Sequence, residues 1–196
     1  MLFVAGMVNL VNAQTDSVMV EDENSVHEVH FVKQIMDRGV TNIVEAYQNY
    51  IQGADTKSPH HYLIYNIMWI ENGEEHLKTI LFFGEYRAKV FSNIKFDKFE
   101  QTMDFYHENK IASIDTKLFV DNHIDLWSSE IEGYLIKVRE GDDIKLISLA
   151  SSELENKEED LTVQFVNGLL KQLKKSQSEV KSYISKTYPI KEKKFK

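Results

Sequence analysis

The stretch HYLIYNIMWI, residues 61–70, decides the fold class of this 196-residue chain. It is rich in aromatic and β-branched residues and runs into Glu71-Asn72-Gly73, whose Asn-Gly pair is the strongest short signal for a β-hairpin. The segment LKTILFF, residues 77–83, supplies the returning strand. Because apolar side chains occupy both faces of the first strand, we expect a sheet that is covered by protein on each side.

Two helices are expected before this hairpin. The first begins near residue 25, where Ser25 and Glu28 have the spacing of a capping box. The second is expected over residues 41–52, because apolar side chains recur there at helical spacing. These apolar residues are Val40, Ile43, Val44, Tyr47 and Ile51.

Strands and a helix are expected after the hairpin. Gly84 marks a bend, after which residues 85–91 continue the returning strand. Residues 96–109 return to helical spacing, with Asp97 as the expected cap. Four short strand-like segments follow, of which the last two are joined by Glu140-Gly141-Asp142-Asp143 as a second hairpin. The segments are TKLFV (116–120), HIDLW (123–127), YLIKVR (134–139) and IKLISL (144–149).

A long helix closes the pattern, over residues 158–186. Its apolar stripe consists of Leu161, Phe165, Leu169, Leu173, Val180 and Ile184. Separate helices and hairpins are typical of the α+β class. The sequence therefore predicts an antiparallel sheet of about 5–6 strands packed against helices, with a long C-terminal helix.

The ends of the chain differ in character from its middle. Residues 1–13 are interpreted as a signal peptide, because an apolar run is followed by Val11-Asn12-Ala13, which fits a cleavage site before Gln14. No Lys or Arg precedes the run, so either the start lies upstream of Met1 or the segment belongs to the fold. Residues 14–24 are expected to be a flexible lead, 25–188 a single α+β domain and 189–196 a basic tail. The expected location is secreted or periplasmic, without an integral membrane span.

Charge is distributed unevenly along the chain. From Lys171 onward, nine Lys against two Glu give +7, which leaves −15 for the preceding 170 residues of a chain whose formal net charge is −8. Either the basic end contacts an anionic surface, or it folds back on the acidic body. The overall acidity argues against nucleic acid as the partner, and no integral membrane span is expected. The expected partner is therefore an unknown protein, a glycan or an envelope component.

Several kinds of chemistry lack sequence support. The chain has no cysteine, which excludes disulfides, thiolate nucleophiles and cysteine metal sites. It has neither a GxSxG elbow nor a glycine-rich phosphate loop, so no cofactor is expected. HEVH, residues 27–30, is one residue short of the zinc-protease pattern HExxH. We interpret His27 and His30 as solvated side chains near a helix start and expect no metal; a metal site would need further ligands, such as His60 and His61.

The segment LWSSEIEGY, residues 126–134, is the best candidate for a site, because a Trp and a Tyr bracket two carboxylates. Acid–base chemistry needs such a pair in one cleft, with one carboxyl group in an apolar setting. The favoured alternative is a strand end with solvent-facing polar residues. The catalytic candidates are Glu130 and Glu132, with Glu85, Asp104, His107, His123 and Asp125 as further possibilities; the candidates for ligand binding are Trp69, Trp127 and Tyr134.

Two functions of different class follow from these patterns. The first is an exported, non-catalytic binding or interaction module of unknown ligand, which uses aromatic residues on its sheet. The second is a small hydrolase or isomerase-type enzyme that uses carboxylate and histidine side chains in a sheet-lined pocket. The missing catalytic motifs favour the first.

Overall fold

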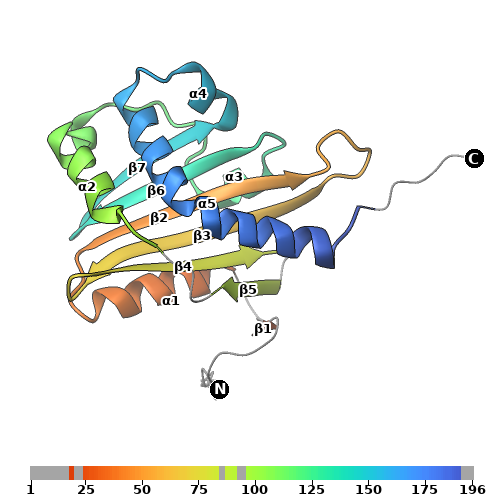
Figure 1. Cartoon of the computed structure of the whole chain (residues 1–196), viewed down its shortest axis with the longest axis horizontal. Coiled ribbons are helices and arrows are strands. Elements are labelled where there is room, and N and C mark those ends of the chain that lie inside the picture. The colour runs from red at the N-terminus through yellow and green to blue at the C-terminus, as the bar shows by residue number, and fades with distance from the viewer. Residues whose placement is uncertain (1–17, 20–23, 84–86, 92–95, 191–196) are drawn as a thin grey trace, which may run out of the picture.

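The computed structural model describes residues 18–19, 24–83, 87–91 and 96–190. A central antiparallel sheet carries helices on both of its faces, and a long helix crosses one face in front of the strands (Figure 1). The expected α+β class, antiparallel sheet and long C-terminal helix are confirmed. The expected signal peptide (1–13) lies outside the described residues, as does most of the basic tail.

The sheet has six longer strands and one two-residue strand, in the order β1-β5-β4-β3-β2-β6-β7. All neighbouring strands pair antiparallel. The strands are β1 (Val18–Met19), β2 (Asn42–Gln52), β3 (His60–Glu71), β4 (Glu74–Phe82), β5 (Arg87–Phe91), β6 (Gly133–Glu140) and β7 (Asp143–Ala150). The helices are α1 (Asn24–Met36), α2 (Phe99–Glu108), α3 (His123–Ser128), α4 (Ser151–Asn156) and α5 (Leu161–Thr187), with a 3₁₀ turn at Ile111–Ser113.

Both predicted hairpins form. In the first, Glu71 pairs with Glu74, and the two loop residues, Asn72 and Gly73, have φ of 55° and 77°. Positive φ at both central positions defines the type I′ turn, whose twist matches that of the flanking strands. The second hairpin joins β6 to β7, with Gly141 at φ 61° in its loop.

Residues 41–52 form strand β2 rather than the expected helix. The apolar positions fit both periods, because Ile43, Tyr47 and Ile51 are separated by four residues and therefore also share one face of a strand. β2 pairs with β3 on one side and β6 on the other. In this central position, the backbone groups of β2 gain hydrogen-bond partners on both sides, and both faces of the strand are buried. The spacing of apolar residues within one segment does not show that such partners exist.

Three further expectations are wrong. Of the expected continuation 85–91, the described residues 87–91 do not extend β4: Phe82 pairs with Ala88, so β5 lies beside β4 and antiparallel to it. Residues 123–127 form helix α3, because Asn122 Oδ1 accepts the amides of Ile124 and Asp125 at 2.9 and 3.0 Å and starts a helical turn. Residues 116–120 are not a strand but lie along edge strand β7, where the Val120 amide donates to Ser148 Oγ at 2.6 Å.

The expected helix caps differ as well. Helix α2 begins at Phe99 after Lys98, which has φ of 64° and no side-chain cap, so Asp97 does not cap it. The expected capping box of Ser25 and Glu28 falls on side chains that lie outside the described set. The long helix begins after Asp160, whose Oδ1 accepts the amides of Thr162 and Val163.

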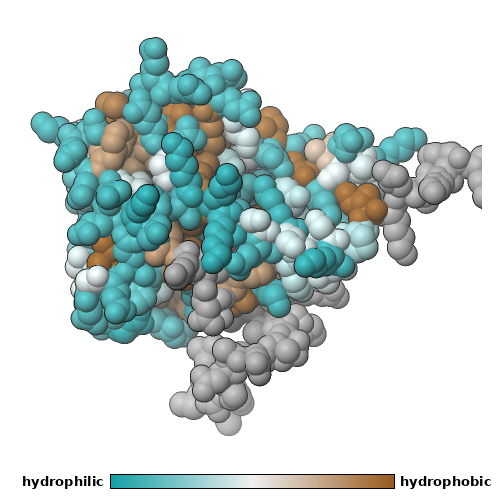
Figure 2. Space-filling model, in the orientation of Figure 1, coloured by the Kyte–Doolittle hydropathy of each residue, from teal (hydrophilic) through white to brown (hydrophobic). Residues whose placement is uncertain are grey.

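The sheet separates the core into two sides. On one side, α2, α4 and α5 pack against residues such as Val44, Met68 and Ile136. On the other, α1 and α3 pack against Ile43 and Leu63 with their neighbours. The predicted stripe of α5 faces the sheet and is fully buried at Phe165, Leu169, Leu173, Val180 and Ile184, whereas Leu161 is 38% exposed. Its opposite face is hydrophilic (Figure 2).

A buried polar network fixes how α5 lies on the sheet. Thr79 Oγ1 of β4 is 2.8 Å from Asn66 Oδ1 of β3 and 2.6 Å from Ser176 Oγ of α5. Ser176 Oγ also donates to Asn66 Oδ1 at 3.2 Å. A one-residue slide of α5 would take Ser176 away from Thr79 and Asn66 and leave its buried hydroxyl group unpaired, which costs about 1–3 kcal/mol. Within the described ranges, no helix is long and apolar enough to cross a membrane.

Candidate functional site

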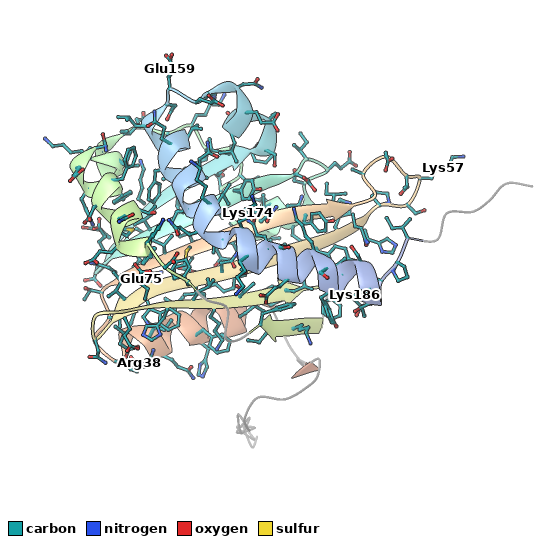
Figure 3. All side chains as sticks on the ribbon, in the orientation of Figure 1. Arg38, Lys57, Glu75, Glu159, Lys174 and Lys186 are labelled. Carbon is teal, nitrogen blue, oxygen red and sulfur yellow. The ribbon has the colours of Figure 1, made fainter. Side chains whose placement is uncertain are left out.

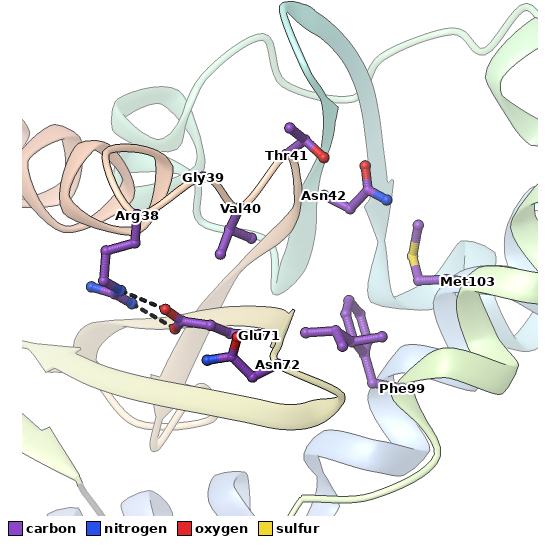
Figure 4. A pocket seen from close by; sticks show the side chains of 10 residues that line it. Arg38, Gly39, Val40, Thr41, Asn42, Glu71, Asn72, Phe99 and Met103 are labelled. Atoms are coloured by element: carbon purple, nitrogen blue, oxygen red, sulfur yellow. Dashed lines mark hydrogen bonds and ion pairs between the residues drawn. The ribbon is translucent and has the colours of Figure 1, made fainter.

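A pocket of about 380 Å³ opens at one end of the sheet (Figure 4). Three parts of the chain meet there: the α1–β2 connection, the tip of the β3–β4 hairpin and helix α2. Its lining combines buried apolar side chains with polar ones. The apolar residues are Val40, Ile70, Phe99 and Met103, and the others are Arg38, Gly39, Thr41, Asn42, Glu71 and Asn72.

An ion pair forms one wall of this pocket. Arg38 Nε and Nη2 donate to Glu71 Oε1 and Oε2 at 2.8 and 3.0 Å, a bidentate geometry that Figure 4 shows as two dashed lines. Trp69 Nε1 donates to the same Oε2 at 3.1 Å, and the Trp69 ring stacks on His76 with 5.1 Å between centroids. The hydrogen bond from Arg38, followed by that from Trp69, lowers the pKa of Glu71 to about 2. The predicted binding residue Trp69 therefore lies behind the pocket wall and orients its carboxylate.

We expect R38Q to raise the pKa of Glu71 from about 2 toward 4.5, the ordinary value of a glutamate side chain. NMR titration of the Glu71 carboxyl carbon measures this change, with K33Q, an exposed residue of the neighbouring helix α1, as the control. A folded-state pKa below the unfolded one adds stability above pH 4.5 that is lost as the pH falls toward 2. The free energy of unfolding of the wild type should therefore fall between pH 4.5 and 2 as this contribution is lost. In R38Q the contribution should be absent throughout this pH range. An unchanged Glu71 titration in R38Q would contradict the role of the ion pair.

A second polar cluster lies on the sheet face that α1 and α3 cover. Its centre is Glu45 of β2, which is only 4% exposed. The hydroxyl groups of Tyr47 and Tyr65 each donate to Glu45 Oε2 at 2.8 Å, and their rings stack with 4.4 Å between centroids. Arg139 Nη2 lies 3.7 Å from Glu45 Oε1. A buried carboxylate is thus compensated by two phenols and a guanidinium.

Two more ionisable groups border this cluster. Lys137 pairs with Glu45 across β6 and β2 and places Nζ 4.8 Å from the centroid of the Tyr47 ring. The ring of His123 stacks on Tyr47 with 5.4 Å between centroids. Burial lowers the pKa of His123 and the charge of Lys137 lowers it further, so the neutral form of this imidazole is favoured.

The two predicted catalytic carboxylates have different surroundings. Glu132 Oε1 accepts the backbone amide of Ile51 at 2.9 Å. Pairing between β2 and β6 ends at Asn49 with Gly133, so the Glu132 side chain replaces the missing strand partner of Ile51. Glu130 is exposed. Asn49 Nδ2 ties this loop to β2 by donating to the carbonyl groups of Ser129 and Ile131 at 2.8 and 3.2 Å.

We expect E132A to lower the free energy of unfolding by about 1–2 kcal/mol, because the half-buried amide of Ile51 loses its acceptor. E132Q, which keeps an acceptor oxygen, should lose less, and E130A should stay within about 0.5 kcal/mol of the wild type, as exposed substitutions do. Urea unfolding followed by circular dichroism measures all three. Equal losses in E130A and E132A would contradict the structural role of Glu132.

The remaining predicted residues are dispersed. Trp127 is partly buried between α3 and the sheet, on the same face as Trp69. Tyr134 lies on the opposite face, where its hydroxyl accepts from Gln48 Nε2 at 3.2 Å. Asp104 and Asp125 are exposed, His107 Nδ1 lies 3.5 Å from Glu140 Oε1, and His123 belongs to the Glu45 cluster. Glu85 lies outside the described residues. The structure thus places Trp69 behind the pocket wall, in contact with Glu71, and does not gather the others into one site.

The HEVH stretch lies in helix α1, where His30 is exposed and the side chain of His27 is outside the described set. His60 and His61 begin β3. Over the described part of the chain, no three His, Cys, Asp or Glu side chains are placed to hold a metal ion.

Comparison with known proteins adds no relative. No protein-family model matches the chain, and no curated protein or solved structure matches it. The function is therefore inferred from the site itself.

Two features of these sites escaped the sequence analysis. Arg38 and Glu71 are 33 residues apart and meet only because the α1–β2 connection and the hairpin tip lie at the same end of the sheet. The hairpin signal placed Glu71 at a turn, but no local signal gives its partner. Glu45 was hidden because a helix was expected where β2 forms; strand alternation would have placed it on one face with Tyr47.

Proposed function

We propose that the protein is an exported, non-catalytic module that binds a small ligand in the pocket at the end of the sheet. One observation carries the proposal: a pocket of about 380 Å³ in which a buried apolar floor adjoins amide and hydroxyl side chains. Ligand sites typically combine an apolar surface with a few fixed polar groups. The ligand that fits such a lining is a small amphipathic molecule with hydrogen-bonding groups at one end, such as a fragment of a glycan or peptide.

The charges around the pocket support binding rather than catalysis. Arg38 and Glu71 neutralise each other, and a carboxylate held by an arginine and a tryptophan is a weak base. None of Glu130, Glu132, Asp104, His107 and His123 lines the pocket. Export is supported by the apolar run and the cleavage pattern in residues 1–13.

NMR of the ¹⁵N-labelled protein, titrated with mono- and disaccharides and with short amphipathic peptides, tests the pocket. We expect amide shifts that cluster at residues 38–42 and 70–72. T41W, which changes an exposed pocket residue, should abolish these shifts while the remainder of the spectrum is retained. E130Q serves as the matched control and should bind as the wild type does.

Shifts that cluster instead around Glu45 and His123, or turnover that E130Q or E132Q removes, would overturn the non-catalytic pocket proposal and favour the enzyme. Export has a separate test. A denatured mass that begins at Gln14, measured on protein from its own host, supports export, and a mass that retains Met1 contradicts it.

A further inference from the structure

The outward face of helix α5 carries five lysines: Lys171, Lys174, Lys175, Lys181 and Lys186. At 100° per residue they fall within about 80° of the direction opposite the buried stripe, together with neutral residues such as Ser178 and Ser182. Lys181 is half-buried and the other four are exposed. Glu179 is the one acidic residue of α5, while Glu158, Glu159 and Asp160 lie just before its start. Figure 3 shows Glu159 at that end and Lys174 and Lys186 along the helix.

The described part of the chain offers these lysines few intramolecular partners. Among the described residues, none of the five lysines forms an ion pair with a carboxylate. Lys181 Nζ instead lies 4.6 Å from the centroid of the Tyr50 ring. The buried stripe packs α5 onto the body of the protein, while its exposed lysines stay accessible to an anionic surface.

Neither the helix dipole nor the solubility of the protein explains the row of five lysines on α5. The helix dipole favours cations only within the last turn, where Lys186 lies, and it does not reach Lys171 to Lys181. Solubility does not require the lysines either, because the chain already has a formal net charge of −8. The buried stripe and the Ser176 network hold α5 in one orientation, so the lysines are presented as a rigid row.

We propose that the exposed face of α5 is a binding surface for anionic phospholipid membranes. From Lys171 to Lys186 the row spans about 22 Å at 1.5 Å per residue, and a flat surface on the outward side of α5 faces the four exposed lysines. Lys89, 4.6 Å from the centroid of the Tyr183 ring, adds a cation at one flank. The apolar stripe is occupied by the sheet, so α5 binds through charge and does not insert into the lipid.

The acidic body does not prevent this contact. Helix α5 lies in front of the strands, in the helical layer that it forms with α2 and α4 on one face of the sheet (Figure 1). At physiological ionic strength, exposed charges more than about 8 Å apart are largely screened from one another. A membrane that touches α5 is separated from the far side of the sheet by the helix and the sheet together.

Co-sedimentation of the full chain with vesicles tests the proposal. Vesicles of phosphatidylglycerol and phosphatidylcholine in a 1:1 ratio should bind the protein, and pure phosphatidylcholine vesicles should not. Each lysine near an anionic surface strengthens binding about fivefold, so K171Q/K174Q/K175Q should weaken binding about a hundredfold. The matched control K33Q/K57Q/K117Q has the same net charge and should bind as the wild type does. Raising the salt concentration to 0.5 M should release the protein.

Two controls isolate the contribution of α5 to vesicle binding. Circular dichroism should show that both triple variants are folded, as expected for exposed positions. K191Q/K193Q/K194Q/K196Q tests the basic tail, and α5 must retain most of the binding in this variant. No binding to anionic vesicles, equal loss in both triple variants, or binding to duplex DNA or heparin without binding to vesicles would overturn the proposal.

This inference goes beyond the proposed pocket function, because it assigns a second surface of the protein to an envelope component. The pocket lies at the end of the sheet and α5 lies across one face, so the two tests are independent. T41W should leave vesicle binding unchanged, and the α5 variant should leave ligand shifts at residues 38–42 unchanged.

Discussion

Replacing Glu45 with alanine should lower the free energy of unfolding by about 3–5 kcal/mol, the usual cost of removing one partner of a buried ion pair. The carboxylate accepts two tyrosine hydroxyls at 2.8 Å each and faces Arg139 at 3.7 Å. In E45A, two phenols lose an acceptor, a largely buried guanidinium loses its ion-pair partner, and a cavity forms in a sheet face that is closed by α1 and α3. Domains of this kind have a total stability of about 5–15 kcal/mol, so the loss is a large fraction.

Three variants separate the contributions to this effect. Y47F removes one of the two donors and should cost about 1 kcal/mol. E45Q keeps the shape and one acceptor oxygen, and its loss should lie between those of Y47F and E45A. E74A, an exposed glutamate on β4, should change stability by less than about 0.5 kcal/mol. Urea unfolding monitored by fluorescence and circular dichroism measures all four variants, and a loss below about 1 kcal/mol in E45A would show that the cluster is not a major source of stability.

The elements predicted correctly are those whose signals are local. Asn72-Gly73 specifies its turn because only a few residue types tolerate positive φ at both positions. The long helix is specified by an apolar stripe that repeats over more than six turns, which no strand pattern imitates. Both signals depend on residues close together in the chain.

The wrong predictions share a physical cause: the secondary structure of a segment depends on the residues and strands beside it in the fold, and not only on its own apolar spacing. The apolar spacing of residues 41–52 suits a helix or a strand, and the choice follows from β3 and β6, which lie on either side. Residues 123–127 look like a strand, but Asn122 supplies a cap, and β7 has no free neighbour there because residues 116–120 lie along its edge. The pocket escaped prediction for the same reason, since its wall joins Arg38 to Glu71 across 33 residues.

A second large effect is expected for a substitution at Leu173, which tests how α5 packs on the sheet. L173A should cost about 2–5 kcal/mol, since the side chain is fully buried among residues of α2, α5 and the sheet. Its neighbour Lys174 points outward, and K174A should change stability by less than about 0.5 kcal/mol. Chemical denaturation of both variants under identical conditions measures the difference.

Leu161 sharpens the same test, because the sequence pattern groups it with Leu173 and the structure separates the two. It is 38% exposed at the first residue of α5, whereas Leu173 is fully buried in the middle of the helix. L161A should therefore cost clearly less than L173A, although the same atoms are removed, because Leu161 stays 38% exposed to water in the folded state. Equal losses in L161A and L173A would show that the whole stripe, including its first turn, is docked on the sheet. A small loss in both would mean that α5 does not rest on the sheet through this face.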